Sequence, residues 1–362
     1  MKIAIIAANN IRVSPYVLFY LNICAENQWE THVFVPDRLE IQETISYGEL
    51  HTFKSWDESK KFSSYRKYAK WVKAQVRDRK IDFIITLTAL SSVFCSPLLL
   101  SKHFKGKYII DIRDYSYEHI SLFKLIEKRL VRNAALRVIS SRKYECFLPK
   151  NENYLVCHNI SFDVTSQAVT EFKTETNLPI RIGYIGAVSY EDQCYKLIDL
   201  VKNDSRFAFE IYGKGVSSEL VEDYVEKIHC SRIQCHGAYQ PNEKASIIKG
   251  VDILFNAYGN DSMKLTCALS NKLYDAFFYG KPLLNSPNTY MDEMGSIISF
   301  PIYLDKEKNL ESLFEWYIHI DNAAATQYAK EMMFQFVQEN ADTINMIECT
   351  INKDNVQRKL CL

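Results

Sequence analysis

The sequence predicts an α/β protein with two Rossmann-like domains, each a doubly wound parallel sheet, that face a cleft. Three observations support this prediction. Short apolar runs alternate with helical patterns, the alternation pauses once over the polar stretch Ser161–Asn177, and 362 residues suffice for two cores. We therefore expect a first domain at residues 1–172, a second at 178–322, and a C-terminal helix at 323–345 that joins the first domain.

The first half alternates strictly between short apolar runs and amphipathic stretches. We expect buried strands at Lys2–Ala8, Thr31–Val35, Ile81–Leu87, Lys107–Ile112, Leu136–Ser140 and Tyr154–Val156. The helices expected between them are Tyr16–Asn27, Ser63–Arg79, Ser92–Phe104, Ser121–Asn133 and Lys143–Leu148. Strands and helices in this order form a parallel sheet, and ligands bind at the carboxyl ends of its strands.

The same alternation restarts after the polar linker. The expected strands are Ile180–Ile185, Phe207–Tyr212, Arg232–His236, Val251–Asn256 and Pro282–Asn285. The expected helices are Cys194–Asn203, Glu219–His229, Asn242–Gly250, a helix that starts at about Asn271, Leu310–Ile320 and Ala323–Glu339. The last twenty or so residues show no clear helix or strand pattern.

The helix that starts near Asn271 is the most informative segment. Ser270 is a good N-cap, and Gly280 suits the left-handed residue that ends a helix. A first turn with Asn271 and Lys272 offers backbone N–H groups, a positive dipole end and a cation, which together suit a phosphate. Asp275 shares their helical face and suits a ribose diol. The alternative is a surface helix that packs its apolar side on a sheet and keeps these polar residues in water.

Charge is unevenly distributed along the chain. Residues 1–175 hold 26 Lys/Arg against 19 Asp/Glu, a net of +7, and residues 176–362 hold 18 against 25, a net of −7. We expect Ser63–Lys80 to place Lys67, Lys70, Trp71 and Lys73 on an anionic membrane surface. The alternatives are a solvated helix face and two unlike domains that attract each other.

Several function classes find no support in the sequence. Nucleic acid binding has no module signature to accompany the charge, and no Gly-x-Gly-x-x-Gly follows the first strand as in a dehydrogenase. The ten cysteines include no Cys-x-x-Cys pair, and Cys230 with Cys235 lacks a second half-site for a metal. No apolar run is long enough to span a membrane. We expect a cytoplasmic protein, peripheral on the inner face of the plasma membrane, without nucleic acid.

The loops that follow the expected strands of the second half carry a recognisable series. It consists of Gly186, then Tyr212-Gly213-Lys-Gly215, then His236-Gly237, then Ser270-Asn-Lys-Leu-Tyr-Asp-Ala-Phe-Phe-Tyr-Gly-Lys-Pro282. This series resembles the donor-binding domain of GT-B glycosyltransferases, specifically the group 1, family 4-like enzymes of bacterial capsular and exopolysaccharide synthesis. The first half is similar to that family too, through Tyr108–Asp114 and the strand at Leu136–Ser141.

The resemblance implies a glycosyltransferase that moves a sugar from a nucleoside-diphosphate sugar to a lipid-linked saccharide. It implies a retaining reaction without a metal or other cofactor, which fits a sequence without Asp-x-Asp. The donor-binding positions are Gly186, Gly213, Gly215, His236, Ser270, Asn271, Lys272 and Asp275. Two positions depart from the family: Cys267 replaces the first acid of a Glu-x7-Glu motif, and Ala187 replaces the usual arginine after the first glycine turn.

On the acceptor side, the resemblance points to loops that follow the strands of the first half. Arg113 and Asp114 are the candidate catalytic residues, with Asp114 positioned to orient or deprotonate the acceptor hydroxyl. Asn9, Asn10 and His119 are expected to line the acceptor side. The alternatives are a structural ion-pair cluster of Asp111, Arg113 and Asp114, and simple turn chemistry at the two asparagines. For the whole chain, the alternatives are a catalytically silent module that binds a partner transferase or lipid acceptor, and a nucleotide-sugar epimerase.

Overall fold

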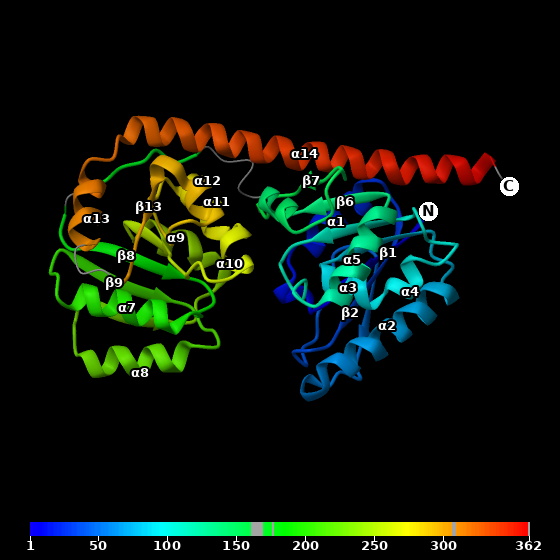
Figure 1. Cartoon of the computed structure of the whole chain (residues 1–362), viewed down its shortest axis with the longest axis horizontal. Helices are drawn as coiled ribbons and strands as arrows, with labels where there is room; N and C mark the ends of the chain where they lie inside the picture. The colour runs from blue at the N-terminus through cyan, green and yellow to red at the C-terminus, as the bar shows by residue number, and fades with distance from the viewer. Residues whose placement is uncertain (161–168, 176, 306–308, 361–362) are drawn as a thin grey trace. The chain divides into compact units, whose positions relative to one another are not determined.

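The computed structural model describes residues 1–160, 169–175, 177–305 and 309–360 (Figure 1). Within these residues the chain divides into two compact units, one of Met1–Asn159 with Gln338–Leu362 and one of Ile160–Val337. Each unit is a sheet of parallel strands with helices against it. The predicted fold class is confirmed, whereas residues 161–168 and 176 of the expected linker lie outside the described residues.

The sheet of the first unit has seven strands in the order β3-β2-β1-β4-β5-β6-β7. They are β1 (Lys2–Ile6), β2 (Glu30–Pro36), β3 (Glu49–Phe53), β4 (Phe83–Leu87), β5 (Tyr108–Ile112), β6 (Leu136–Ile139) and β7 (Leu155–Val156). Central strands such as β1, β4 and β5 are almost fully buried, as expected for strands covered on both faces. The strand order reverses between β1 and β4, so the loop after β1 lies at the topological switch point.

The helices of the first unit are α1 (Val17–Glu26), α2 (Lys61–Asp78), α3 (Ala89–Phe94), α4 (Ser96–Leu99) and α5 (Ser121–Asn133). The single helix predicted at Ser92–Phe104 is wrong, because two short helices replace it and Pro97 lies in the first turn of the second. The helix predicted at Lys143–Leu148 is a 3-10 helix, Arg142–Cys146. The edge strand β3 was not predicted, since its polar residues conceal it.

The sheet of the second unit has six strands in the order β10-β9-β8-β11-β12-β13. They are β8 (Ile180–Ile185), β9 (Phe207–Tyr212), β10 (Ile233–Gly237), β11 (Ile253–Asn256), β12 (Leu283–Asn285) and β13 (Ser299–Pro301). The helices are α7 (Glu191–Lys202), α8 (Ser218–Ile228), α9 (Lys244–Lys249), α10 (Met263–Cys267), α11 (Asn271–Tyr279), α12 (Tyr290–Gly295) and α13 (Asn309–Ile318). Here the order reverses between β8 and β11, which places the Gly186 turn at the switch point.

Helix α14 (Asn322–Leu360) continues past the helix end predicted at Glu339 and past residue 345, the end of the segment expected to join the first domain. Its residues up to Val337 belong to the second unit and those from Gln338 to the first, so only its later part joins the first unit as expected. In the second unit Phe336 packs its ring against Tyr274 and Phe277 of α11. In the first unit Asn340 accepts a hydrogen bond from the His158 N–H and donates one to the His158 carbonyl. Among the described residues, no helix is both long enough and apolar enough to cross a membrane.

Candidate functional site

Helix α11 has the N-cap and the C-terminal end that the sequence predicts. The Ser270 hydroxyl accepts a hydrogen bond from the Lys272 N–H at 3.1 Å, and Gly280 ends the helix in the left-handed conformation with φ 61°. The backbone N–H of Leu273 donates to the Ser270 carbonyl at 3.0 Å. Because two N–H groups of the first turn are already bonded, the positive character of this helix end rests mainly on the dipole and on Lys272.

A buried polar network fixes Ser270 at the end of β11. The Ser270 hydroxyl donates to Asn256 Oδ1 at 2.9 Å, and the Asn256 amide donates to Asn285 Oδ1 at 2.9 Å. Asn285 in turn donates to Ser299 Oγ at 2.8 Å. Asn256 and Asn285 are paired residues of β11 and β12, so the network ties the carboxyl ends of adjacent strands to the start of α11. The sequence did not predict this network.

The Lys272 ammonium lies in a pocket of aromatic rings at the switch point of the second sheet. Its Nζ donates a hydrogen bond to the Tyr258 hydroxyl and lies 5.0 Å from the centre of the Tyr184 ring. A Cβ atom on Gly186 would lie 3.6 Å from the same Nζ. Lys272 and Gly186, which the sequence assigned to one site, are therefore neighbours. The aromatic box around the ammonium was missed, because nothing in the sequence shows that Tyr184 and Tyr258 converge.

Burial lowers the pKa of Lys272 to about 8, with the Lys244 ammonium also lowering it and Asp275 raising it. An ammonium held among rings stays charged at neutral pH only at a cost in solvation. An anion that reached Nζ would restore the lost stabilisation of the charge. The geometry therefore suits a diphosphate.

The glycine turns that precede this pocket leave no room for side chains. Gly186 and Gly213 have φ values of 131° and 129°, which only glycine adopts without strain. A Cβ on Gly213 would lie 1.8 Å from the Gly186 carbonyl oxygen, and one on Gly215 would lie 2.2 Å from that of Val188. The two loops thus pack backbone against backbone beside Lys272.

Asp275 lies on α11 near Lys272, and its carboxylate is ion-paired. Lys244 Nζ lies 2.8 Å from one of its oxygens and 2.7 Å from the other. Each carboxylate oxygen of Asp275 can still accept a further hydrogen bond, for example from a hydroxyl of a diol. The sequence missed Lys244, which begins α9 after a capping box of Gln240 and Glu243.

The remaining donor-side predictions lie on the same edge of the sheet. His236 stacks on Tyr212 with ring centres 4.2 Å apart and pairs with Glu210 through Nε2. Asn271 is exposed in the first turn of α11. Cys267, the position where the family carries an acid, is 3% exposed at the end of α10.

In the first unit, Arg113 is held in a buried cluster. It lies 2.8 Å from Asp111 Oδ2, donates to the Cys157 carbonyl at 3.0 Å and lies over the Tyr16 ring. Asp111 Oδ2 also accepts from the Tyr20 hydroxyl at 2.8 Å, and burial raises the pKa of Asp111. This arrangement contains two members, Asp111 and Arg113, of the structural ion-pair cluster that was the alternative to a catalytic Arg113. Asp114, the third residue of that alternative, and His119 are exposed.

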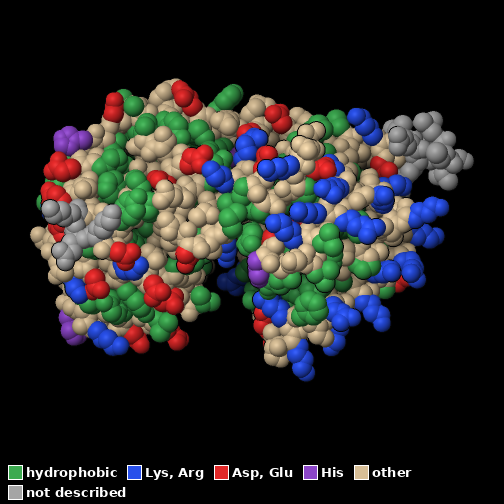
Figure 2. Space-filling model, in the orientation of Figure 1, with side chains coloured by type: hydrophobic (Ala, Val, Ile, Leu, Met, Phe, Trp, Pro, Cys, Tyr) green, Lys and Arg blue, Asp and Glu red, His purple; other side chains and the backbone are tan. Residues whose placement is uncertain are grey.

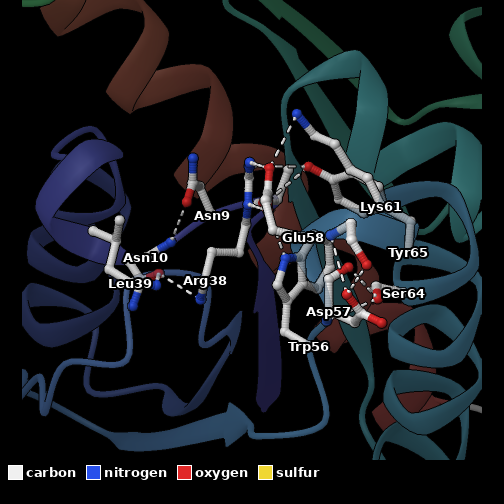
Figure 3. A network of polar contacts seen from close by, with 12 residues as sticks. Asn9, Asn10, Arg38, Leu39, Trp56, Asp57, Glu58, Lys61, Ser64 and Tyr65 are labelled. Atoms are coloured by element: carbon white, nitrogen blue, oxygen red, sulfur yellow. Dashed lines mark hydrogen bonds and ion pairs between the residues drawn. The ribbon is translucent and has the colours of Figure 1, made fainter. Parts of the chain in front are cut away.

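The loop after β1 is built around Asn10 (Figure 3). Asn10 is fully buried, and its Oδ1 accepts from the N–H groups of Arg38 and Leu39 at 2.9 and 3.1 Å. Its amide donates to Glu43 at 3.1 Å. Asn9 is half-buried and bonds only the Asn10 N–H among the contacts described. Asn10 therefore shapes the loop, as turn chemistry predicts, and Asn9 is better placed to meet a ligand.

The predicted membrane-facing residues on α2 do not share one environment. Lys67, Lys70 and Lys73 are exposed, and Figure 2 shows many basic side chains over the first unit. Trp71 is half-buried and packs its ring against Phe34 and Phe53 of the sheet, at 5.8 and 5.6 Å between ring centres. Trp71 thus packs α2 against the sheet and does not lie on the exposed face of the helix with the lysines.

An apolar groove of about 540 Å³ is lined by residues from the first turns of α2 and α5 and from α3 and α4. Phe62 and Leu122, 69% and 67% exposed, are among its lining residues, as are Lys61 and Arg66. We call this feature the α2–α5 groove. The sequence did not reveal it, because its apolar residues come from separate segments that only the fold brings together.

No protein family model and no curated protein matches the chain. Solved structures do match it over nearly its whole length. A sucrose-phosphate synthase from Thermosynechococcus elongatus is 13% identical with a TM-score of 0.70, and the match covers 99% of each chain. Anabaena HepE, solved with UDP and glucose, is 13% identical with a TM-score of 0.67 over 95% of this chain and 99% of that one.

Two further solved structures bear on the choice of function. The lipopolysaccharide outer core galactosyltransferase WaaB is 15% identical with a TM-score of 0.65, covering 96% of this chain and all of that one. A putative UDP-N-acetylglucosamine 2-epimerase from Listeria monocytogenes is 11% identical with a TM-score of 0.58 over 91% and 90%. At these identities the likeness shows the fold: the chain has the two parallel-sheet domains of the GT-B architecture.

Proposed function

We propose that this protein is a glycosyltransferase that takes a sugar from a nucleoside-diphosphate sugar. The observation that carries the proposal is the position of the Lys272 ammonium, at the positive end of α11 and beside Gly186 at the switch point of the second sheet. Fold relatives described as glycosyltransferases, one of them solved with UDP and glucose, support it. Asp275 is the proposed acceptor for the ribose hydroxyls.

Sugar transfer builds negative charge on the leaving diphosphate while the sugar acquires oxocarbenium character. In the proposed mechanism, Lys272 and the start of α11 stabilise that charge, and the bare backbone of Gly186 and Gly213 lets the diphosphate approach closely. These groups act without a metal. Retention of the anomeric configuration, as in the family that the sequence resembles, is part of the proposal.

For the acceptor we propose a lipid-linked saccharide of surface polysaccharide synthesis, with the protein peripheral on the cytoplasmic face of the membrane. The α2–α5 groove supports this proposal, because an apolar groove whose lining includes Lys61 and Arg66 suits a lipid chain beside a phosphate. The exposed lysines of α2 add positive charge on the same unit. Asp114 is the proposed group that orients the acceptor hydroxyl. Arg113, the residue before it, is proposed to hold the backbone that carries Asp114 in place.

Two other functions fit particular observations. The solved epimerase of similar fold keeps a nucleotide-sugar epimerase as the second candidate. Cys267 and Ala187, which replace an acid and an arginine of the family motif, favour a silent module that binds a partner transferase or a lipid acceptor.

Thermal shift with UDP-, GDP- and TDP-sugars separates these functions. A transferase gains stability with one of these donors and hydrolyses it slowly in the absence of an acceptor. An epimerase converts the sugar while it is still attached to the nucleotide, which chromatography of the unreacted donor detects. If no nucleotide sugar raises the melting temperature, the transferase proposal is wrong and the binding module is favoured.

A further inference from the structure

Two histidines and a glutamate converge on one face of the edge of the first sheet. His32 lies on β2, and Glu49 and His51 lie on β3. In the parallel register His32 pairs with Glu49, and Phe34 pairs with His51. Because side chains two residues apart point to the same face of a strand, this pairing brings the three side chains together.

The three nearest polar atoms form a small triangle. His32 Nδ1 lies 3.1 Å from His51 Nε2, and Glu49 Oε2 lies 3.5 Å from each of them. Ligands at ~2.0–2.2 Å from a tetrahedral zinc ion lie roughly 3.3–3.6 Å from one another. The triangle therefore already has nearly the dimensions of one face of such a site.

The surroundings hold both rings in place. His32 is 3% exposed, and His51 stacks on Phe34 with ring centres 4.9 Å apart. Glu30 Oε1 lies 3.3 Å from His32 Nε2, so a carboxylate is positioned to accept the N–H that a ligating imidazole presents away from its metal.

A chain of hydrogen bonds is the competing explanation for the same geometry. Arg79 Nη2 lies 3.5 Å from His51 Nδ1, so the guanidinium can donate to His51, His51 to His32, and His32 to Glu30. In a metal site His51 Nδ1 carries a proton and Arg79 turns away. Glu49 distinguishes the explanations, since the chain of hydrogen bonds does not need it.

We propose that His32, Glu49 and His51 bind a zinc ion whose fourth ligand is water, and that the ion fastens the edge strand β3 to β2. The ligand set of two imidazoles and one carboxylate suits zinc among the common divalent ions. The site lies wholly in the first unit and needs no nucleotide sugar, so it stands or fails separately from the proposed transferase function.

The test is a titration of chelator-treated full-length protein with Co²⁺, followed by displacement with Zn²⁺. One equivalent of Co²⁺ is expected to give the intense visible absorption of tetrahedral cobalt, and Zn²⁺ is expected to abolish it and raise the melting temperature. Glu49→Gln and His51→Gln are expected to weaken Co²⁺ binding at least tenfold. His103→Gln, at an exposed histidine of the same unit, is the matched control and leaves binding unchanged.

Exposed cysteines such as Cys146 and Cys349 also bind these ions. If Co²⁺ binds there, Glu49→Gln binds it as tightly as the wild type does. Binding that is absent, or that Glu49→Gln does not weaken, overturns the proposal and leaves the hydrogen-bond chain. The Glu49 side chain is two-thirds exposed, so its replacement by glutamine is expected to leave folding intact. Arg79→Gln is expected to tighten binding, because it removes a positive charge beside His51; weaker binding in this variant contradicts the proposed site.

Discussion

The Nζ atom of Lys272 lies 3.6 Å from the position that a Cβ atom on Gly186 would occupy. These residues are far apart in the sequence, yet the strand order of the second sheet brings the turn after β8 beside the start of α11. A cation, a helix N-terminus and a glycine turn in one place are the components of a phosphate site.

Nucleotide affinity is expected to fall as the pH rises above about 8. Burial holds the pKa of Lys272 at about 8, and only the charged ammonium attracts a diphosphate. Above that pH, affinity falls up to about tenfold per pH unit, and binding is accompanied by proton uptake. Calorimetry from neutral to alkaline pH measures both effects. Lys272→Arg keeps its charge in this range, so a wild-type decline that persists in this variant contradicts the assignment.

Asp275→Asn is expected to weaken binding of the preferred nucleotide about tenfold, because an amide is a poorer acceptor for the ribose diol than a carboxylate. The sharper comparison uses the 2′,3′-dideoxy analogue, which lacks the diol. With this analogue the wild type and the variant should bind almost equally. An equal loss with both nucleotides would mean that Asp275 acts through Lys244 and not through ribose.

The fold was largely readable from the sequence because most strands are buried on both faces. Apolar runs such as Ile180–Ile185 and Phe207–Tyr212 coincide with β8 and β9 to the residue. Some of the failures occur where burial is partial. Edge strands β3 and β13 carry too few apolar residues for a clear pattern, and the second half of α14 mixes polar and apolar residues.

The candidate site could be predicted only as far as local motifs reach. Ser270, Lys272 and Gly280 lie in one continuous segment whose capping chemistry is visible in the sequence. Tyr258 reaches the site from the loop after β11 and Lys244 from α9, so only the tertiary structure reveals them. Arg113 was assigned to catalysis by resemblance, and the sequence did not show that Asp111 and Cys157 hold it in the core.

A buried pair of glutamates should make the protein less stable at alkaline pH. Burial, and then the charge of Glu118, raise the pKa of Glu127 to about 8, and burial also raises the pKa of Glu118. The folded state therefore binds a proton that the unfolded state releases near its ordinary pKa of 4.5. The stabilisation is full below that value and is lost as the pH rises towards about 8, on the order of a few kcal/mol.

Glu127→Gln keeps a neutral side chain at every pH and should remove most of this decline. Urea unfolding at about pH 6 and at about pH 9 gives the free energy of unfolding at each pH, and the difference between the two values measures the decline. The matched control is Glu226→Gln, at an exposed glutamate of α8. If Glu127→Gln loses stability between the two pH values as steeply as the wild type, the pair does not carry the effect.

Binding to anionic vesicles should depend on both the charge and the groove of the first unit. Neutralising Lys67, Lys70 and Lys73 together should reduce co-sedimentation with phosphatidylglycerol vesicles and make the remainder less sensitive to salt. Leu122→Ser in the α2–α5 groove should weaken binding by removing apolar contact. Leu220→Ser, at a similarly exposed leucine of α8, is the control. If the amount of protein that co-sediments does not depend on the anionic lipid content of the vesicles, the membrane proposal is wrong.

The central claim is that the start of α11 binds the diphosphate of a nucleotide sugar. Calorimetric titration of the nucleotide that responds in the thermal screen tests it most directly, with Lys272→Gln compared with Lys227→Gln at an exposed lysine of α8. Loss of a charge-assisted contact of about 1.5–3 kcal/mol predicts a roughly tenfold to hundredfold weaker Kd for Lys272→Gln and an unchanged Kd for Lys227→Gln. Equal affinity in the two variants would contradict the account.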